Sequence, residues 1–108
     1  MASLKTAEIM KEGAKHVEDW LNKNEYTSVK KDAWQTGSVD IQADSLGKNI
    51  FIQVYTVLHP NTQAILKGTD KFAVKDLAER LDRVPYIAYL VIDENKNLVG
   101  EIDWERLS

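Results

Sequence analysis

The residues that could do chemistry are one acid and two neutral polar side chains in two short apolar segments. Asp40 lies in GSVDIQA (37–43), and Gln53 and Tyr55 lie in IFIQVYT (50–56). A carboxylate such as Asp40 can ligate a hard cation like Mg²⁺. Gln53 offers a neutral carbonyl oxygen, and Tyr55, with a reference pKa of about 10, is neutral at pH 7. Asp40 could also be a structural acid that hydrogen-bonds a turn, and the other two could be ordinary polar residues of a sheet.

An aromatic residue and several lysines are further candidates for contact with a ligand. Trp34, in DAWQTG, could stack on a nucleic-acid base, anchor a partner, or cover the end of a sheet. Lys48 follows a turn-forming segment and could contact nucleic acid or swing towards Asp40, as could Lys67 or Lys71. A lysine near a turn is more often only solvated.

Other catalytic patterns are missing from the sequence. The chain has no cysteine, which excludes disulfides, thiol catalysis and thiolate metal sites. His16 and His59 are too few and too separated for a recognisable metal motif. Ser38 has no spacing that suggests a triad, and there is no G-x-S-x-G motif or Gly-rich phosphate loop.

The composition is that of one small globular domain. The chain has 108 residues, of which 44% are hydrophobic and 29% charged, so we expect 1–108 to form a single domain. The net charge is −3, and residues 90–108 carry five acidic and two basic side chains. Nucleic-acid binding usually shows an excess of Lys and Arg, so the charge does not support it. No apolar run approaches the roughly 20 residues that cross a bilayer, and no signal peptide is visible. We expect a cytoplasmic protein without membrane contact.

Hydropathy patterns predict seven elements. In chain order they are a helix at 4–23, strands at 25–31, 38–43 and 50–57, a helix at 70–83, and strands at 86–93 and 98–102. The helices are predicted from apolar side chains at spacings of three and four. Strands 50–57 and 86–93 are apolar on both faces, which is typical of central strands covered by helices on both sides. Because a helical crossover favours parallel strands, we expect an α/β fold of order α-β-β-β-α-β-β with a mixed sheet.

Local signals predict how these elements begin and end. Ser3 could cap the first helix, and Thr69 or Asp70 the second. Gly47 is expected to adopt a positive φ between two strands. The predicted apolar stripe of the second helix is Phe72, Ala73, Leu77 and Leu81. The segment DWERL (103–107) is expected to form one last helical turn.

This element order, with an acid on the second strand, resembles the PD-(D/E)xK or restriction-endonuclease-like nuclease superfamily. GSVDIQA is similar to the Gly-x-x-Asp-apolar form of the family's second strand. IFIQVYT falls where the family has apolar-apolar-Glu-apolar-Lys, and VPYIAYLVIDENKNLVGEIDWERL resembles the strand and hairpin after the second helix. The resemblance covers nearly the whole chain and implies a restriction-endonuclease-like core.

The resemblance also implies catalytic positions, and most of them are altered here. In the family, two acids ligate Mg²⁺ and a lysine helps to activate the attacking water. Asp40 matches the first acid and is the implied metal ligand, whereas Gln53 replaces the second acid and Tyr55 replaces the lysine. Some relatives use a Gly-Glu pair on the first helix, but here Gly13 precedes an alanine and Glu12 comes one residue too early.

Three hypotheses follow. In the first, the chain is a non-catalytic relative without a cofactor, which binds a protein partner or a second copy through exposed strands such as 25–31 and 98–102. In the second, it is a divergent Mg²⁺-dependent nuclease or Holliday-junction-resolvase-like enzyme. It would use Asp40, Gln53 as a carbonyl ligand, a displaced acid such as Glu12 or Asp44, and a displaced lysine. In the third, it is an unrelated α/β protein. The residues favour the first without deciding whether an enzymatic activity survives.

Overall fold

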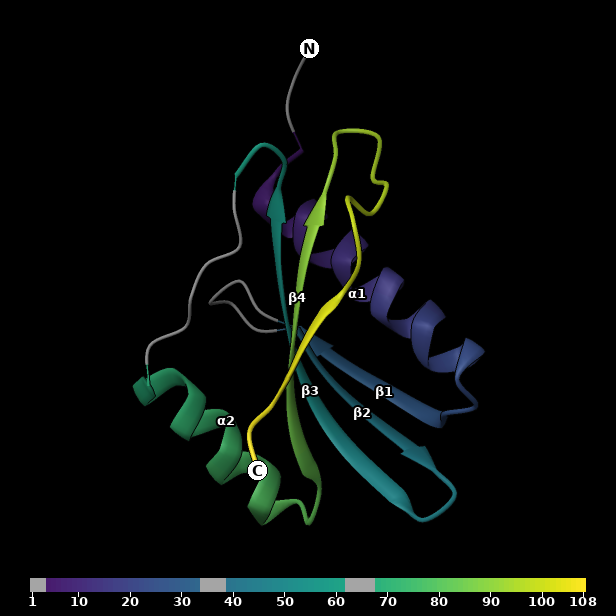
Figure 1. The fold of residues 1–108 in the computed structure, drawn as a ribbon, viewed down its shortest axis with the longest axis vertical. Helices are drawn as coiled ribbons and strands as arrows, with labels where there is room; N and C mark the ends of the chain where they lie inside the picture. Colours follow the sequence, from purple (N-terminus) through teal and green to yellow (C-terminus); the bar gives the residue numbers. More distant parts are fainter. Residues whose placement is uncertain (1–3, 34–38, 62–67) are drawn as a thin grey trace.

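In a computed structural model, the described residues form two helices on either side of one five-stranded sheet (Figure 1). The residues that the structure describes are 4–33, 39–61 and 68–108. The elements are α1 (Thr6–Lys23), β1 (Thr27–Ala33), β2 (Val39–Ser45), β3 (Lys48–Leu58), α2 (Gly68–Arg80), β4 (Val84–Ile92) and β5 (Asp103–Arg106). The fold is therefore α/β with the element order that the sequence predicted. Within these residues, no helix is long and apolar enough to span a membrane.

The strands lie in the sheet in chain order, β1-β2-β3-β4-β5. β1, β2 and β3 form an antiparallel meander, and Gly47 in the β2–β3 turn has the expected positive φ, 76°. β3 and β4 are parallel, as predicted for strands joined by a helical crossover, and β5 returns antiparallel to β4. The sheet is mixed because the crossover through α2 joins β3 and β4 as parallel neighbours, whereas all other neighbouring strands are antiparallel.

α1 covers one face of the sheet with the apolar stripe expected from its sequence. The stripe consists of the buried side chains of Met10, Ala14, Val17 and Leu21. It packs against alternate residues of the central strands, among them Ile41, Ile52 and Leu90. α2 lies on the other side of the sheet (Figure 1). The two helices therefore account for the lack of polar alternation in β3 and β4.

The predicted stripe of α2 is largely wrong. The buried side chains of α2 are Val74 and Ala78, which pack with Phe51 of β3, and Leu77 is partly buried beside them. The remaining predicted stripe residues are exposed, namely Phe72, Ala73 and Leu81. The helix ends at Arg80 rather than at residue 83, so Leu81 lies beyond its last turn. The face of α2 that meets the sheet is therefore formed by Val74, Leu77 and Ala78.

The C-terminal segment also differs from the prediction. The strand is β5, Asp103–Arg106, not 98–102, and no helical turn forms there. Gly100, with φ 77°, bends the chain within the predicted strand. Pairing with β4 resumes at Asp103, opposite Tyr89, and the next residue, Trp104, lies opposite Ala88. There its indole ring packs beside that of Trp20 on α1, with ring centroids 4.8 Å apart.

The predicted helix caps are not found in the described residues. Ser3 lies outside them, and the residue that precedes α1 is Lys5, whose side chain makes no capping hydrogen bond. α2 begins at Gly68, so Thr69 and Asp70 lie within its first turn rather than before it.

Candidate functional site

Asp40 and Gln53 lie directly opposite each other on neighbouring antiparallel strands, β2 and β3. Paired residues of such strands point to the same face of the sheet. The amide Nε2 of Gln53 donates a hydrogen bond of 3.0 Å to Oδ1 of Asp40. Asp40 is only 5% exposed, so this bond forms away from bulk water. A hydrogen bond to a charged group contributes about 1.5–3 kcal/mol to stability.

Tyr55 joins this pair from two residues further along β3, and therefore from the same face. Its hydroxyl donates to Oε1 of Gln53 at 2.8 Å. Gln53 thus donates through its nitrogen to an acid and accepts through its oxygen from a phenol, which fixes the orientation of the amide. The structure brings the three predicted residues together in one hydrogen-bonded row, here called the Asp40 network (Asp40, Gln53, Tyr55).

Polar side chains continue across the sheet beyond the Asp40 network. Tyr89 of β4 is the register partner of Tyr55 in β3, and their rings stack with centroids 6.4 Å apart. The hydroxyl of Tyr89 donates to Oε1 of Glu105 at 3.3 Å. The other oxygen of Glu105 lies 2.9 Å from Nζ of Lys71 on α2. The sequence interpretation missed Tyr89 and Glu105. It considered that Lys71 could swing towards Asp40, whereas Lys71 pairs with Glu105.

Tyr89 is a neutral hydrogen-bond donor at ordinary pH. Burial raises the pKa of Tyr89 from 10.0 to about 12, and the negative charge of Glu105 acts in the same direction. The side chain is 7% exposed, which agrees with burial as the larger cause. Tyr89 therefore keeps its proton and holds the carboxylate of Glu105, instead of supplying a base or a nucleophile.

Other candidates lie away from the Asp40 network or outside the described residues. Lys48 is exposed and pairs with Ser45 at the end of the β2–β3 hairpin. It is five residues from Gln53 along β3, or about 16 Å at the usual rise of a strand. Trp34 and Lys67 lie outside the described residues. The structure thus leaves Lys48 on the surface rather than beside Asp40.

The two acids considered as displaced catalytic groups have other partners. Oδ1 of Asp44 lies 2.7 Å from Nη1 of Arg83, which anchors the start of β4 to β2. Glu12 forms an ion pair of 3.2 Å with Lys15 on α1. α1 packs on the face of the sheet opposite to Asp40, so Glu12, which belongs to α1, lies on the other side of the sheet. Neither acid belongs to the Asp40 network.

The Asp40 network does not fit a magnesium ion. Mg²⁺ prefers negatively charged oxygen ligands in octahedral geometry. The network supplies one carboxylate, of which one oxygen already accepts from Gln53, and two neutral side chains. In the described parts of the chain, no group of three or more His, Cys, Asp or Glu side chains is placed to hold a metal ion.

Comparison of the chain with models of protein families gives no match, and comparison with curated proteins gives none either. What the chain does must therefore be inferred from the α/β fold and from the Asp40 network.

Proposed function

We propose that the chain is a non-catalytic member of the PD-(D/E)xK superfamily, with a restriction-endonuclease-like core, which acts as a binding or assembly module. The element order α-β-β-β-α-β-β and the mixed sheet between two helices support this proposal. Further support comes from the positions of Asp40 on the second strand and of Gln53 and Tyr55 on the third, where the family has its motif.

The observation that carries the proposal is the hydrogen bond from Gln53 to Asp40. A second carboxylate at position 53 would repel Asp40 at close range unless a cation bridged the two. An amide donates a hydrogen bond to Asp40 instead, so no bridging cation is needed to hold the two side chains together. Tyr55 stands in place of the lysine and is neutral, so it brings no cation to a phosphate. The chemistry of these three side chains therefore favours a structural role.

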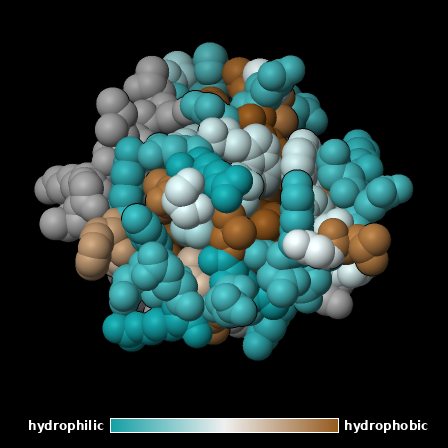
Figure 2. Space-filling view, turned by 60° about the horizontal axis from the view of Figure 1, so that its bottom comes forward, coloured by the Kyte–Doolittle hydropathy of each residue, from teal (hydrophilic) through white to brown (hydrophobic). Residues whose placement is uncertain are grey.

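The partner that the surface favours is another protein or a second copy of this chain. The basic excess typical of nucleic-acid binding is absent from the sequence. The edge strands β1 and β5 each pair with a single neighbouring strand of the described sheet, and such edges can accept a further strand. The face in Figure 2 is mostly hydrophilic, with a small hydrophobic group near its middle. Exposed Phe72 and Leu46 offer further apolar contacts.

Restoring the family motif tests the proposal. The wild-type protein should leave single- and double-stranded DNA and RNA intact in the presence of Mg²⁺ or Mn²⁺. The double variant Gln53→Glu/Tyr55→Lys places an acid and a lysine at the motif positions, so it should bind Mn²⁺ in a calorimetric titration. Gln42→Glu is the matched control, because it adds an acid to the same face of β2 without completing the motif. Metal-dependent cleavage by the wild type that disappears in Asp40→Ala would overturn the proposal.

The assembly part of the proposal has its own measurement. Light scattering coupled to gel filtration over a range of protein concentrations reports the mass of the particle in solution. A dimer that dissociates on dilution would identify the second copy as the partner. A monomer at all concentrations would exclude a second copy as the partner, and the proposal would then require a different protein as the partner.

A further inference from the structure

The outer edge of β5 presents backbone hydrogen-bonding groups at defined positions. The amide of Leu107 donates a hydrogen bond of 3.0 Å to the carbonyl of Pro85 in β4. Along an antiparallel strand, residues that point their backbone groups at the neighbouring strand alternate with residues that point them away. Trp104 and Arg106 therefore direct their N–H and C=O groups away from β4. Among the described residues, β5 pairs with β4 alone, so these groups are placed to pair with a further strand.

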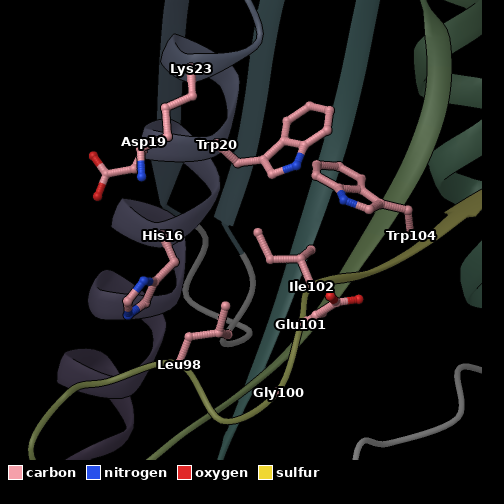
Figure 3. A pocket seen from close by; sticks show the side chains of 9 residues that line it. All are labelled: His16, Asp19, Trp20, Lys23, Leu98, Gly100, Glu101, Ile102 and Trp104. Carbon is pink, nitrogen blue, oxygen red and sulfur yellow. The ribbon is translucent and has the colours of Figure 1, made fainter.

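A pocket of about 510 Å³ adjoins β5 on the α1 side of the sheet, here called the tryptophan pocket. It lies between α1 and the segment 98–104, and the rings of Trp20 and Trp104 meet there with centroids 4.8 Å apart (Figure 3). Trp20 is 36% exposed, although the stripe of α1 is buried. The carboxylates of Asp19 and Glu101 point away from the indole rings (Figure 3). The indole walls therefore suit a bulky apolar side chain.

A second hollow, of about 420 Å³, adjoins β5 on the α2 side and is here called the lysine groove. It is lined by Lys71, Phe72 and Lys75 of α2 and by Leu107, and Phe72 is 70% exposed. Lys71 pairs with Glu105 of β5 at 2.9 Å. Lys75 is exposed and makes no ion pair with a described residue. The lysine groove therefore suits an acidic side chain, whose aliphatic part can lie against Phe72.

From these observations we propose that β5 binds an extended peptide of another protein as a sixth strand of the sheet. Pairing of the peptide backbone with Trp104 and Arg106 gives affinity, and alternate side chains that enter the two hollows give specificity. Because neighbouring residues of a strand point to opposite faces, the peptide carries a bulky apolar residue and an acidic residue an odd number of positions apart. This inference rests on the proposed function as a binding module and names its edge and the chemistry of its partner.

A second copy of the chain is disfavoured at this edge by its own charges. Symmetric antiparallel pairing of two β5 strands places the two-fold axis at one residue of the strand, so that the outward-facing groups meet. An axis at Asp103, Glu105 or Arg106 pairs that charged residue with itself, and an axis at Trp104 pairs Asp103 with Glu105. Like charges directly opposite each other destabilise neighbouring strands. The edge therefore favours a strand from a different protein.

The test is an NMR titration of the full chain with capped octapeptides of threonine that contain one phenylalanine and one glutamate, in either order. Peptides with these two residues one or three positions apart should shift the amide signals of Trp104 and Arg106 and the indole signals of Trp20 and Trp104. Peptides with the two residues two positions apart should bind about two- to five-fold more weakly, because both side chains then point to one face and the contact with a lysine is lost.

Two pairs of variants test the edge and the lysine groove separately. Arg106→Pro removes an outward-facing N–H, a position at which edge strands accept proline. It should weaken peptide binding about tenfold relative to Arg106→Ala, the matched control that keeps the N–H. Lys75→Gln should weaken binding of the glutamate peptide about two- to five-fold and leave binding of its glutamine version unchanged. Lys11→Gln, which removes the same charge at an exposed position of α1, should change neither. Circular dichroism of each variant checks that it is folded.

Several outcomes would overturn the inference. Equal binding of peptides with odd and even spacing would do so, as would equal binding by Arg106→Pro and Arg106→Ala. An absence of amide and indole shifts at millimolar peptide would also contradict it. A wild-type dimer that Arg106→Pro dissociates would assign the edge to a second copy. Metal-dependent cleavage by the wild type would refute the proposed function itself, whereas a lack of peptide binding without cleavage would refute only the assignment of β5.

Discussion

The replacement of Gly13 by alanine would test the contact that seats α1 on the sheet. A Cβ atom at position 13 would lie 1.7 Å from Oγ1 of Thr56 and 2.7 Å from its Cβ. Thr56 belongs to β3 and is 8% exposed, so its β-branched side chain has little room to turn away. In the described residues its hydroxyl has no hydrogen-bond partner, so no bond is lost when it moves. The cost of Gly13→Ala is therefore steric.

The expected destabilisation is about 2 kcal/mol. Overpacking a well-packed core costs about 1–3 kcal/mol, and a contact this short belongs at the upper end. Alanine offsets part of this cost because it stabilises a helix interior by about 0.5–1 kcal/mol relative to glycine. For a domain of this size the net loss corresponds to a Tm lower by about 8 °C or more.

Urea unfolding followed by circular dichroism measures this loss. Lys11→Ala, at an exposed position of α1, is the control and should change the free energy of unfolding by less than about 0.5 kcal/mol. In a Thr56→Ala background, Gly13→Ala should cost less, because two of the crowding atoms are gone. A Gly13→Ala protein as stable as the wild type would refute the close approach of α1 to β3.

Three further variants test the polar contacts of the sheet. The pKa of Tyr89 is about 12 in the folded protein and 10.0 without the surrounding fold. The free energy of unfolding should therefore fall as pH rises above 10, by about 1.4 kcal/mol at pH 11. Tyr89→Phe should remove this part of the pH dependence of urea unfolding. Arg83→Met removes a 2.7 Å ion pair with Asp44 and should lower the free energy of unfolding by about 1–2 kcal/mol, measured at low salt. Gln53→Leu removes a donor from buried Asp40, so thermal unfolding should show a loss of about 1.5–3 kcal/mol.

The parts of the fold that were predictable are those where local patterns and tertiary packing agree. The α1 stripe and the apolar strands β3 and β4 bury the residues that their periodicity indicated. The prediction failed in α2, where Val74 and Ala78 meet the sheet in place of the exposed Phe72 and Ala73. It failed again at β5, where Trp104 packs on Trp20, a residue far away in the sequence. The α2 stripe does have helical spacing in the sequence, whereas the contact of Trp104 with Trp20 leaves no signal in its own segment.

In the candidate site, too, one contact was predictable from the sequence and the others were not. A two-residue turn at 46–47 fixes the hairpin register, so the pairing of Asp40 with Gln53 could have been worked out from the sequence. The stacking of Tyr55 on Tyr89 could not, because the register of parallel strands depends on how the α2 crossover packs. The link from Tyr89 to Glu105 depends in turn on β5, whose position the sequence did not indicate.

A calorimetric titration with Mg²⁺ and Mn²⁺, on the wild type and on Asp40→Ala in parallel, tests the central claim most directly. The proposed non-catalytic role predicts no specific binding by either protein, because Gln53 offers Asp40 a hydrogen-bond donor in place of a second acidic metal ligand. Stoichiometric binding by the wild type that is lost in Asp40→Ala would contradict it, and would identify Asp40 as a metal ligand of a working site.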